Sequence, residues 1–295
     1  MTTLFKDDAA KARVAAEFAR WRALVPAATS RTVSTRFGET HALVAGPEDA
    51  PPLVVLHGAL ASSAHAMFEI GPLRDHFRVY ALDVLGQSVM SADARVPVDG
   101  PAYGEWLRDA LDGLGLERAS IYGVSWGGFV ARRLAEVAPD RIDRLVLLVP
   151  AGIVGGPAWR GLTEVGIPMA LYRAFPSEAR LRRFARGILS ELDDDWVRFF
   201  GVAFSAYKLD MRIPPLAERG PLAGFKRPTL VFGASEDVSF PGEALLARAK
   251  ELFPQAELEL LAGLKHAPPS TDAFRSKMAD RIASFLGSDV LRMSA

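Results

Sequence analysis

Short apolar runs alternate with amphipathic stretches along much of the chain. Leu53 to Leu56 form a continuous apolar run, as expected for a strand that is covered on both faces. The strands that we predict cover residues 53–56, 77–82, 119–124, 145–149, 229–232 and 257–261. The helices that we predict between them cover residues 103–114, 126–138, 242–252 and 272–286. This alternation predicts an α/β fold with a mostly parallel, twisted sheet that is covered by helices.

The first part of the chain has a different pattern. Residues 7–25 are predicted to form an amphipathic helix that Pro26 ends. Residues 31–37 and 40–45 are predicted to form a hairpin whose strands are joined around Gly38-Glu39. We therefore expect a helical N-terminal extension, residues 1–30, ahead of the core.

The middle of the chain interrupts the strand–helix rhythm. Between residues 151 and 225 no continuous apolar strand run occurs. Helical stretches are predicted around residues 161–174, 177–190 and 193–208, with Ser177 and Asp193 as caps of the second and third. The pattern predicts a core of residues 31–150 and 226–295 with residues 151–225 inserted after the strand at 145–149.

Composition narrows the partners that we expect. The chain of 295 residues has 35 basic and 35 acidic side chains, so its net charge of zero gives no field that would attract nucleic acid or anionic lipid. It has no Cys, which excludes disulfides, thiolate catalysis and Cys-based zinc sites. No signal-peptide pattern or membrane-length apolar run occurs. We expect a cytoplasmic protein with no cofactor, metal, nucleic-acid or membrane partner; the oligomeric state is left open.

The strongest chemical signal is Gly123-Val124-Ser125-Trp126-Gly127, which lies between a predicted strand and a predicted helix. This is the context of a nucleophile elbow, in which a serine sits on a sharp turn. Glycine is needed on both sides because the turn is strained and the neighbouring chain passes close to it. Ser88 is a control, since it has a glycine two residues before it and none two residues after it. The motif predicts that Ser125 is an exposed nucleophile.

A serine hydroxyl needs a base, and the base needs a partner that fixes its tautomer. Of five histidines, only His266 follows the insertion, in a loop at the sheet edge that carries the elbow. The acid is expected in the loop after residues 229–232, which holds Glu236 and Asp237. We prefer Asp237, because its shorter side chain holds an imidazole more rigidly. The alternative is that both acids only cap the next helix.

Together, these residues resemble the α/β-hydrolase fold family over residues 31–286, in its serine esterase branch. The resemblance implies that residues 151–225 form a helical cap. It also implies that His57-Gly58 belongs to an oxyanion loop, where the backbone N–H groups of Ala59 and Trp126 would hold the oxyanion. Asp237-x-x-x-Pro241 matches a spacing often seen after the acid strand, whereas the usual distance from Gly233 would favour Glu236.

The resemblance implies the chemistry of a serine hydrolase. A serine at the elbow argues against the haloalkane dehalogenase and epoxide hydrolase branches, which need a carboxylate nucleophile. We therefore expect hydrolysis of small carboxylic esters through an acyl-enzyme formed by Ser125, His266 and Asp237. The alternatives are carbon–carbon bond hydrolysis on the same fold and a non-catalytic ligand-binding member. His57 is interpreted as a structural residue of the oxyanion loop.

The insertion is expected to select the substrate. Its aromatic side chains suggest an apolar pocket, although packing of helices on a sheet also uses such residues. Its arginines could include an anchor for a substrate carboxylate, but most are expected on a solvated helix face. The six arginines considered are Arg160, Arg173, Arg180, Arg182, Arg183 and Arg186.

Overall fold

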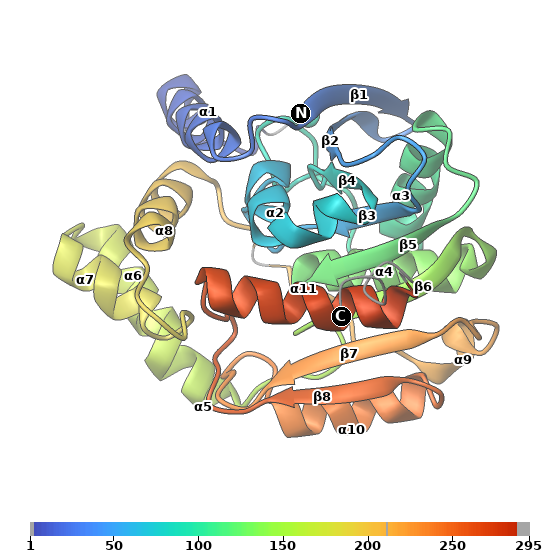
Figure 1. Ribbon diagram of the computed structural model, residues 1–295. Helices are drawn as coiled ribbons and strands as arrows, with labels where there is room; N and C mark the ends of the chain where they lie inside the picture. Colours follow the sequence, from blue (N-terminus) through green and yellow to red (C-terminus); the bar gives the residue numbers. More distant parts are fainter. Residues whose placement is uncertain (1–2, 211, 288–295) are drawn as a thin grey trace.

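The computed structural model describes residues 3–210 and 212–287, and their centre is an eight-stranded sheet with the order β1-β2-β4-β3-β5-β6-β7-β8 (Figure 1). The strands are β1 (Thr29–Thr35), β2 (Gly38–Ala45), β3 (Pro52–Leu56), β4 (Arg78–Leu82), β5 (Ala119–Val124), β6 (Ile142–Leu148), β7 (Thr229–Ala234) and β8 (Glu257–Leu261). β2 pairs antiparallel with β1 and β4, and all other pairs are parallel. The predicted fold class is confirmed.

Helices cover both faces of this sheet. They are α1 (Asp8–Ala23), α2 (Ser63–Glu69), α3 (Ala102–Gly113), α4 (Trp126–Val137), α10 (Gly242–Leu252) and α11 (Asp272–Leu286), with short 3₁₀ helices η1 (Gly71–Asp75) and η2 (Pro139–Arg141). Helices α3, α4 and α10 pack on the face that carries Val54 and Leu56. Helices α2 and α11 pack on the opposite face, with Leu53 and Val55. Successive β3 residues therefore point into two separate cores, which explains the continuous apolar run.

Helices also fill the segment between β6 and β7 (Figure 1). They are α5 (Ala158–Arg160), a π-helical segment η3 (Gly161–Gly166), α6 (Ile167–Ala174), α7 (Glu178–Ala185), α8 (Asp194–Ala206) and α9 (Arg219–Leu222). Ser177 accepts a hydrogen bond from the Arg180 N–H, and Asp193 accepts from the N–H groups of Asp195 and Trp196. Both predicted caps are thus present. The division into core and cap domains remains a prediction.

The N-terminal helix α1 packs against both the core and the inserted helices. Trp21 is buried, and its ring lies 5.3 Å from those of Phe68 in the core and Trp196 in α8. Ahead of the helix, Lys6 N–H donates to the carbonyl of Ala206. Residues 3–23 therefore join the core to the inserted helices.

The hairpin turn was predicted two residues too late. Thr35 pairs with Gly38, so the turn consists of Arg36 and Phe37, and Gly38 is the first residue of β2. Gly38 has φ +123°, and a Cβ there would lie 2.7 Å from Ala92 Cβ. The glycine is thus required by the exit from the turn rather than by its centre. In the described part of the chain, no helix combines the length and apolarity needed to cross a bilayer.

Candidate active site

Ser125 lies on the predicted sharp turn between β5 and α4. Its backbone has φ 50° and ψ −109°, a conformation that is strained for a residue with a Cβ. A Cβ on Gly123 would lie 2.5 Å from the carbonyl oxygen of Gly127, and one on Gly127 would lie 2.2 Å from that of Leu56. The two glycines therefore let α4 start directly against β3 and β5, with Ser125 at the tip of the turn.

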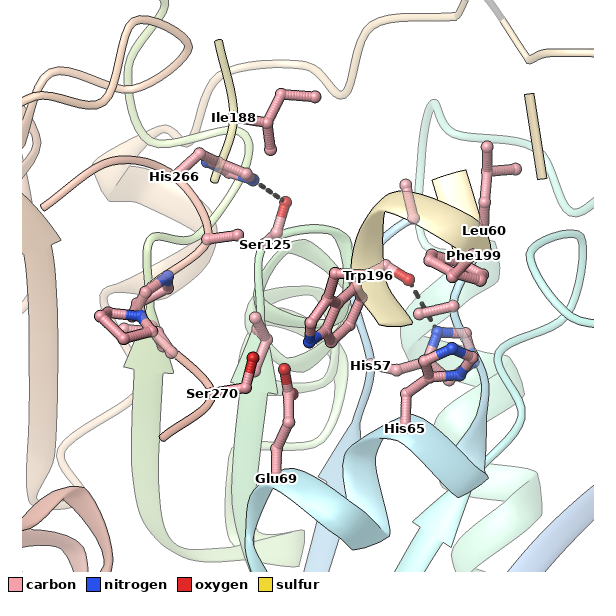
Figure 2. Close-up of a pocket in the computed structure, with 18 of the residues that line it drawn as sticks. His57, Leu60, His65, Glu69, Ser125, Ile188, Trp196, Phe199, His266 and Ser270 are labelled. Carbon is pink, nitrogen blue, oxygen red and sulfur yellow. Dashed lines mark hydrogen bonds between the residues drawn. The ribbon is translucent and has the colours of Figure 1, made fainter. Parts of the chain in front are cut away.

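Three of the predicted residues form one hydrogen-bonded chain. His266 Nε2 lies 2.9 Å from Ser125 Oγ, and His266 Nδ1 lies 2.7 Å from Asp237 Oδ2 (Figure 2 shows the first of these contacts). Glu236, the alternative acid, is exposed. Asp237 is buried, and its second oxygen accepts from the N–H groups of Ser239 and Phe240 at 2.7 and 3.1 Å. These bonds orient the carboxylate toward the imidazole and leave no role for it as a cap of α10.

The electrostatics of His266 suit a proton acceptor. Burial disfavours its charged form, but the charge and the hydrogen bond of Asp237 outweigh burial and raise the pKa of His266 above its ordinary value. With Nδ1–H donated to Asp237, Nε2 is the unprotonated nitrogen that faces Ser125. A stabilised imidazolium and a correctly oriented lone pair are what removal of a serine proton requires.

The predicted oxyanion loop lies against Ser125. A Cβ on Gly58 would be 3.7 Å from Ser125 Cβ. The next residue is Ala59, and Trp126 is the first residue of α4. Among the hydrogen bonds of the described residues, neither backbone N–H has an acceptor. Both groups are thus free to donate to a ligand beside the serine.

His57 supports this loop from within. Its Nδ1 lies 2.7 Å from the carbonyl oxygen of Gly58, and its Nε2 accepts from the N–H of Val84 at 3.0 Å. Burial lowers the pKa of His57, so the ring stays neutral in this arrangement. Leu60 has a positive φ of 62°, and its N–H donates a hydrogen bond to Gln87 Oε1. The contacts agree with a structural role for His57.

Asp83 is a buried residue that the sequence analysis did not single out. Its side chain accepts from the N–H of Ser63 at 2.9 Å and from the hydroxyls of Ser63 and Ser88. It also lies 2.6 Å from His41 Nδ1. Asp83 therefore ties the start of α2, and with it the end of the oxyanion loop, to the segment after β4. A lone Asp at a strand end carries no local signal for this role.

A cavity of about 310 Å³ opens beside Ser125 and His266 (Figure 2). The aromatic side chains that line it from the inserted segment are Trp196, Phe199, Phe200 and Phe204. Part of the aromatic content of this segment therefore faces the cavity, while Trp159 and Phe175 are exposed. None of the six arginines considered above lines the cavity; Arg275 of α11 does. No group of three or more His, Asp or Glu side chains within residues 3–210 and 212–287 is arranged to hold a metal ion.

The chain is similar to known proteins with the alpha/beta hydrolase fold. A family model for the alpha/beta hydrolase fold matches residues 51–162. Carboxylesterase YbfK of Bacillus subtilis (strain 168) is 41% identical over 119 residues, and the uncharacterized carboxylesterase nap of the same organism is 40% identical over 119 residues. Each alignment covers 40% of this chain and 40% of the relative, so it spans less than half the length of these curated proteins.

The similarity of fold extends over nearly the whole chain. The crystal structure of carboxylesterase CesB (YbfK) from Bacillus subtilis matches with a TM-score of 0.78, covering 94% of this chain and 98% of that chain at 24% sequence identity. The sheet order, the turn at Ser125 and the matching family model agree with one another. The chain has the α/β-hydrolase fold.

Proposed function

We propose that this protein is a serine hydrolase that cleaves carboxylic esters through an acyl-enzyme. The observation that carries the proposal is the chain of contacts from Ser125 Oγ through His266 to Asp237, at 2.9 and 2.7 Å, beside a cavity. The unpaired N–H groups of Ala59 and Trp126 support it, because an oxyanion needs donors next to the nucleophile. The names of YbfK and nap as carboxylesterases favour an ester as the substrate.

The geometry supports a two-step reaction. In the first step His266 Nε2 accepts the proton of Ser125, whose Oγ attacks the ester carbonyl. The oxyanion that forms lies between the N–H groups of Ala59 and Trp126. The C–O bond to the alcohol then breaks, and His266 returns its proton to the leaving alcohol. In the second step water loses a proton to His266 and attacks the acyl-enzyme carbonyl. The bond to Ser125 Oγ then breaks, His266 returns the proton to Oγ, and the acid is released.

The proposal is tested with p-nitrophenyl esters of increasing acyl length. Wild-type protein should hydrolyse them and should be labelled by a fluorophosphonate, and Ser125→Ala protein with an unchanged circular dichroism spectrum should do neither. Unchanged turnover in Ser125→Ala would overturn the proposal, and failure of the wild type to react would favour a non-catalytic ligand-binding member. A dienoate ring-cleavage product, assayed beside the esters, distinguishes carbon–carbon bond hydrolysis.

The acid limb of the pH–rate profile gives an independent test. His266 must be neutral to accept a proton, and Asp237 raises the pKa of His266 above its ordinary 6.5. Measured kcat/KM should therefore fall as the pH drops through a value above 6.5. In Asp237→Asn the residual activity should have its acid limb at lower pH, because burial then acts on His266 without the compensating charge. An acid limb that does not move would argue against Asp237 as the partner of the base.

A further inference from the structure

Helix α2 presents two polar side chains to the cavity, His65 and Glu69. They are four residues apart and therefore lie on the same side of the helix, one turn from each other. Figure 2 shows Glu69 pointing up into the cavity, below Ser125 and beside Trp196. Most of the remaining lining is apolar or aromatic, so this side of α2 is a local polar surface within a cavity that otherwise suits a hydrocarbon chain.

Glu69 has no partner for its carboxyl group within the described residues. It makes no hydrogen bond and no ion pair there, although it lies near the charge of Arg275. Burial raises the pKa of Glu69 to about 7, and the nearby Arg275 cation opposes this only in part. The hydroxyls of Tyr122 and Ser270 line the same cavity and are likewise without hydrogen bonds in the described structure. Such groups are costly to leave unpaired and are ready to bind a ligand.

His65 is the other polar residue of α2 that lines the cavity, and it is 2% exposed. Its Nδ1 lies 2.8 Å from Ser62 Oγ, whereas its Nε2 has no partner among the described residues. Burial lowers the pKa of His65 far below its ordinary value, so the ring is neutral. It packs between aromatic rings, with centroids 4.4 Å from Trp21 and 4.3 Å from Phe199. His65 therefore adds no positive charge to this side of the cavity.

The charges around Glu69 leave a net negative site. Arg275 is the cation that faces it from α11, but its guanidinium donates to the Phe68 carbonyl at 2.8 Å and to the Asp272 carboxylate. The same guanidinium stacks on the Phe68 ring at 4.1 Å from the centroid. Tyr122, which faces Glu69 from β5, has its pKa raised by burial and by Glu69, so it stays uncharged. Because Arg275 also pairs with Asp272, it compensates the charge of Glu69 only in part.

We propose that the α2 side of the cavity, formed by His65, Glu69, Tyr122 and Ser270, binds a protonated amine on the non-reacting arm of the ester substrate. The carboxylate of Glu69 and the hydroxyl oxygens of Tyr122 and Ser270 accept from the ammonium N–H groups. The ring of Trp196, which lines the same part of the cavity, adds a favourable cation–π contact. An ester that carries such an amine is thus the substrate class of the proposed esterase. Its hydrolysis rests on the proposed function, whereas binding of the amine does not.

The test compares probes of equal length that differ only in their end group. The probes are n-hexylammonium, hexan-1-ol and n-hexanoate, used as competitive inhibitors of p-nitrophenyl acetate hydrolysis, whose short acyl chain leaves the cavity largely free. At pH 8 we expect hexylammonium to bind about 10-fold or more tightly than hexan-1-ol, as for a charge-assisted hydrogen bond. The advantage should shrink as the pH falls through about 7, because Glu69 becomes protonated, while an alkylamine, like Lys, stays charged.

Two variants test whether the preference for hexylammonium depends on Glu69. Glu69→Gln keeps the shape of the side chain and breaks no hydrogen bond of the described residues, and it should reduce the preference for hexylammonium over hexan-1-ol to about twofold or less. Glu178→Gln is the matched control, since Glu178 is an exposed residue of α7 outside the cavity. It should leave the preference unchanged. Thermal unfolding of both variants shows whether each is folded.

Three outcomes would overturn the proposal. Equal binding of the three probes would show that charge is not recognised, tighter binding of hexanoate would assign the site to an anion held by Arg275, and an unchanged preference in Glu69→Gln would exclude the carboxylate. Calorimetric titration of the same probes into Ser125→Ala protein measures binding without turnover. If Ser125→Ala protein prefers hexylammonium in this titration while the wild type hydrolyses no ester, the proposed reaction is refuted and the proposed amine site is not.

Discussion

Residues 3–210 and 212–287 contain two Ser-His-Asp arrangements of nearly the same dimensions. In the candidate active site, His266 lies 2.9 Å from Ser125 and 2.7 Å from Asp237. Between β1, β2 and the segment after β4, His41 Nε2 lies 3.1 Å from Ser30 Oγ, and His41 Nδ1 lies 2.6 Å from Asp83 Oδ2. By interatomic distance alone the two could not be told apart.

Their surroundings differ in every feature that a nucleophile needs. Ser125 has a strained backbone on a turn, whereas Ser30 lies on the exposed edge strand β1. Neither Ser30 nor His41 lines the cavity beside Ser125. Asp83 is shared with two serine side chains and a backbone N–H, which makes it a structural node. A hydrogen-bonded Ser-His-Asp set alone therefore does not mark a candidate catalytic site; the strained turn, the unpaired backbone N–H groups and the cavity distinguish the one at Ser125.

The largest effect should separate the two serines. Ser125→Ala should lower kcat/KM for p-nitrophenyl acetate by about 10⁴-fold or more, because no other group can form the acyl-enzyme. Ser30→Ala removes the same atom from the second arrangement and should change kcat/KM by less than about twofold. Steady-state kinetics of the two variants measure this difference. A large loss of activity in a folded Ser30→Ala protein would mean that the edge-strand arrangement takes part in the reaction.

Substitution of Asp237 should mainly lower kcat, whereas substitution of Asp83 should mainly lower stability. Asp237→Asn should lower kcat by about 10⁴-fold, because the amide favours the wrong tautomer of His266. Asp83→Asn should lower the free energy of unfolding by about 2–4 kcal/mol, since it leaves several buried donors poorly paired. Its kcat should stay within about tenfold of wild type while the protein is folded. Urea unfolding and kinetics on both variants give the contrast, and equal losses of kcat would contradict it.

The residues of the first arrangement could be found in the sequence, and those of the second could not. Ser125 is marked by flanking glycines, because the local turn requires them, and His266 and Asp237 follow from chain order along alternating strands and helices. Ser30, His41 and Asp83 meet only through strand pairing and carry no local pattern.

The same limit explains what else the sequence analysis missed. The docking of Trp21 against both Phe68 and Trp196, and the direction in which Glu69 points, depend on contacts between distant segments. The hairpin turn was misplaced because glycine serves either the centre or the exit of a turn, and the approach of Ala92 to Gly38 decides between them. Periodicity predicts elements, whereas tertiary contacts decide what their polar residues do.

The turn itself can be tested through Gly127. In Gly127→Ala the new Cβ would lie 2.2 Å from the carbonyl oxygen of Leu56, so α4 must move away from β3. We expect a loss of more than about 2 kcal/mol in the free energy of unfolding, together with loss of fluorophosphonate labelling. Gly155→Ala is the control, since no atom lies within 4 Å of the added Cβ, and should change stability by less than about 0.5 kcal/mol. A Gly127→Ala protein with wild-type stability and labelling would show that the elbow tolerates a side chain.

The smallest effect distinguishes the two histidine–aspartate pairs by the pH dependence of stability. Asp237 raises the pKa of His266 above 6.5, so the stability that this pair contributes is present at low pH and is lost as the pH rises through that raised value. Burial alone would raise the pKa of Asp83, but the hydrogen bond and charge of His41 outweigh it and hold the pKa below 3.8. The contribution of Asp83 is therefore present above its ordinary pKa and is lost only as the pH falls through the lower folded value.

Urea unfolding between pH 3 and pH 9 should reveal these opposite dependences. The stability difference between wild type and His266→Gln should shrink from pH 5 to pH 9. The difference between wild type and Asp83→Asn should stay constant over that range and shrink only in acid below about pH 4. If both differences shrank in the same direction, the two pairs would have the same electrostatic character. The contrast between them would then rest on the position of their serines alone.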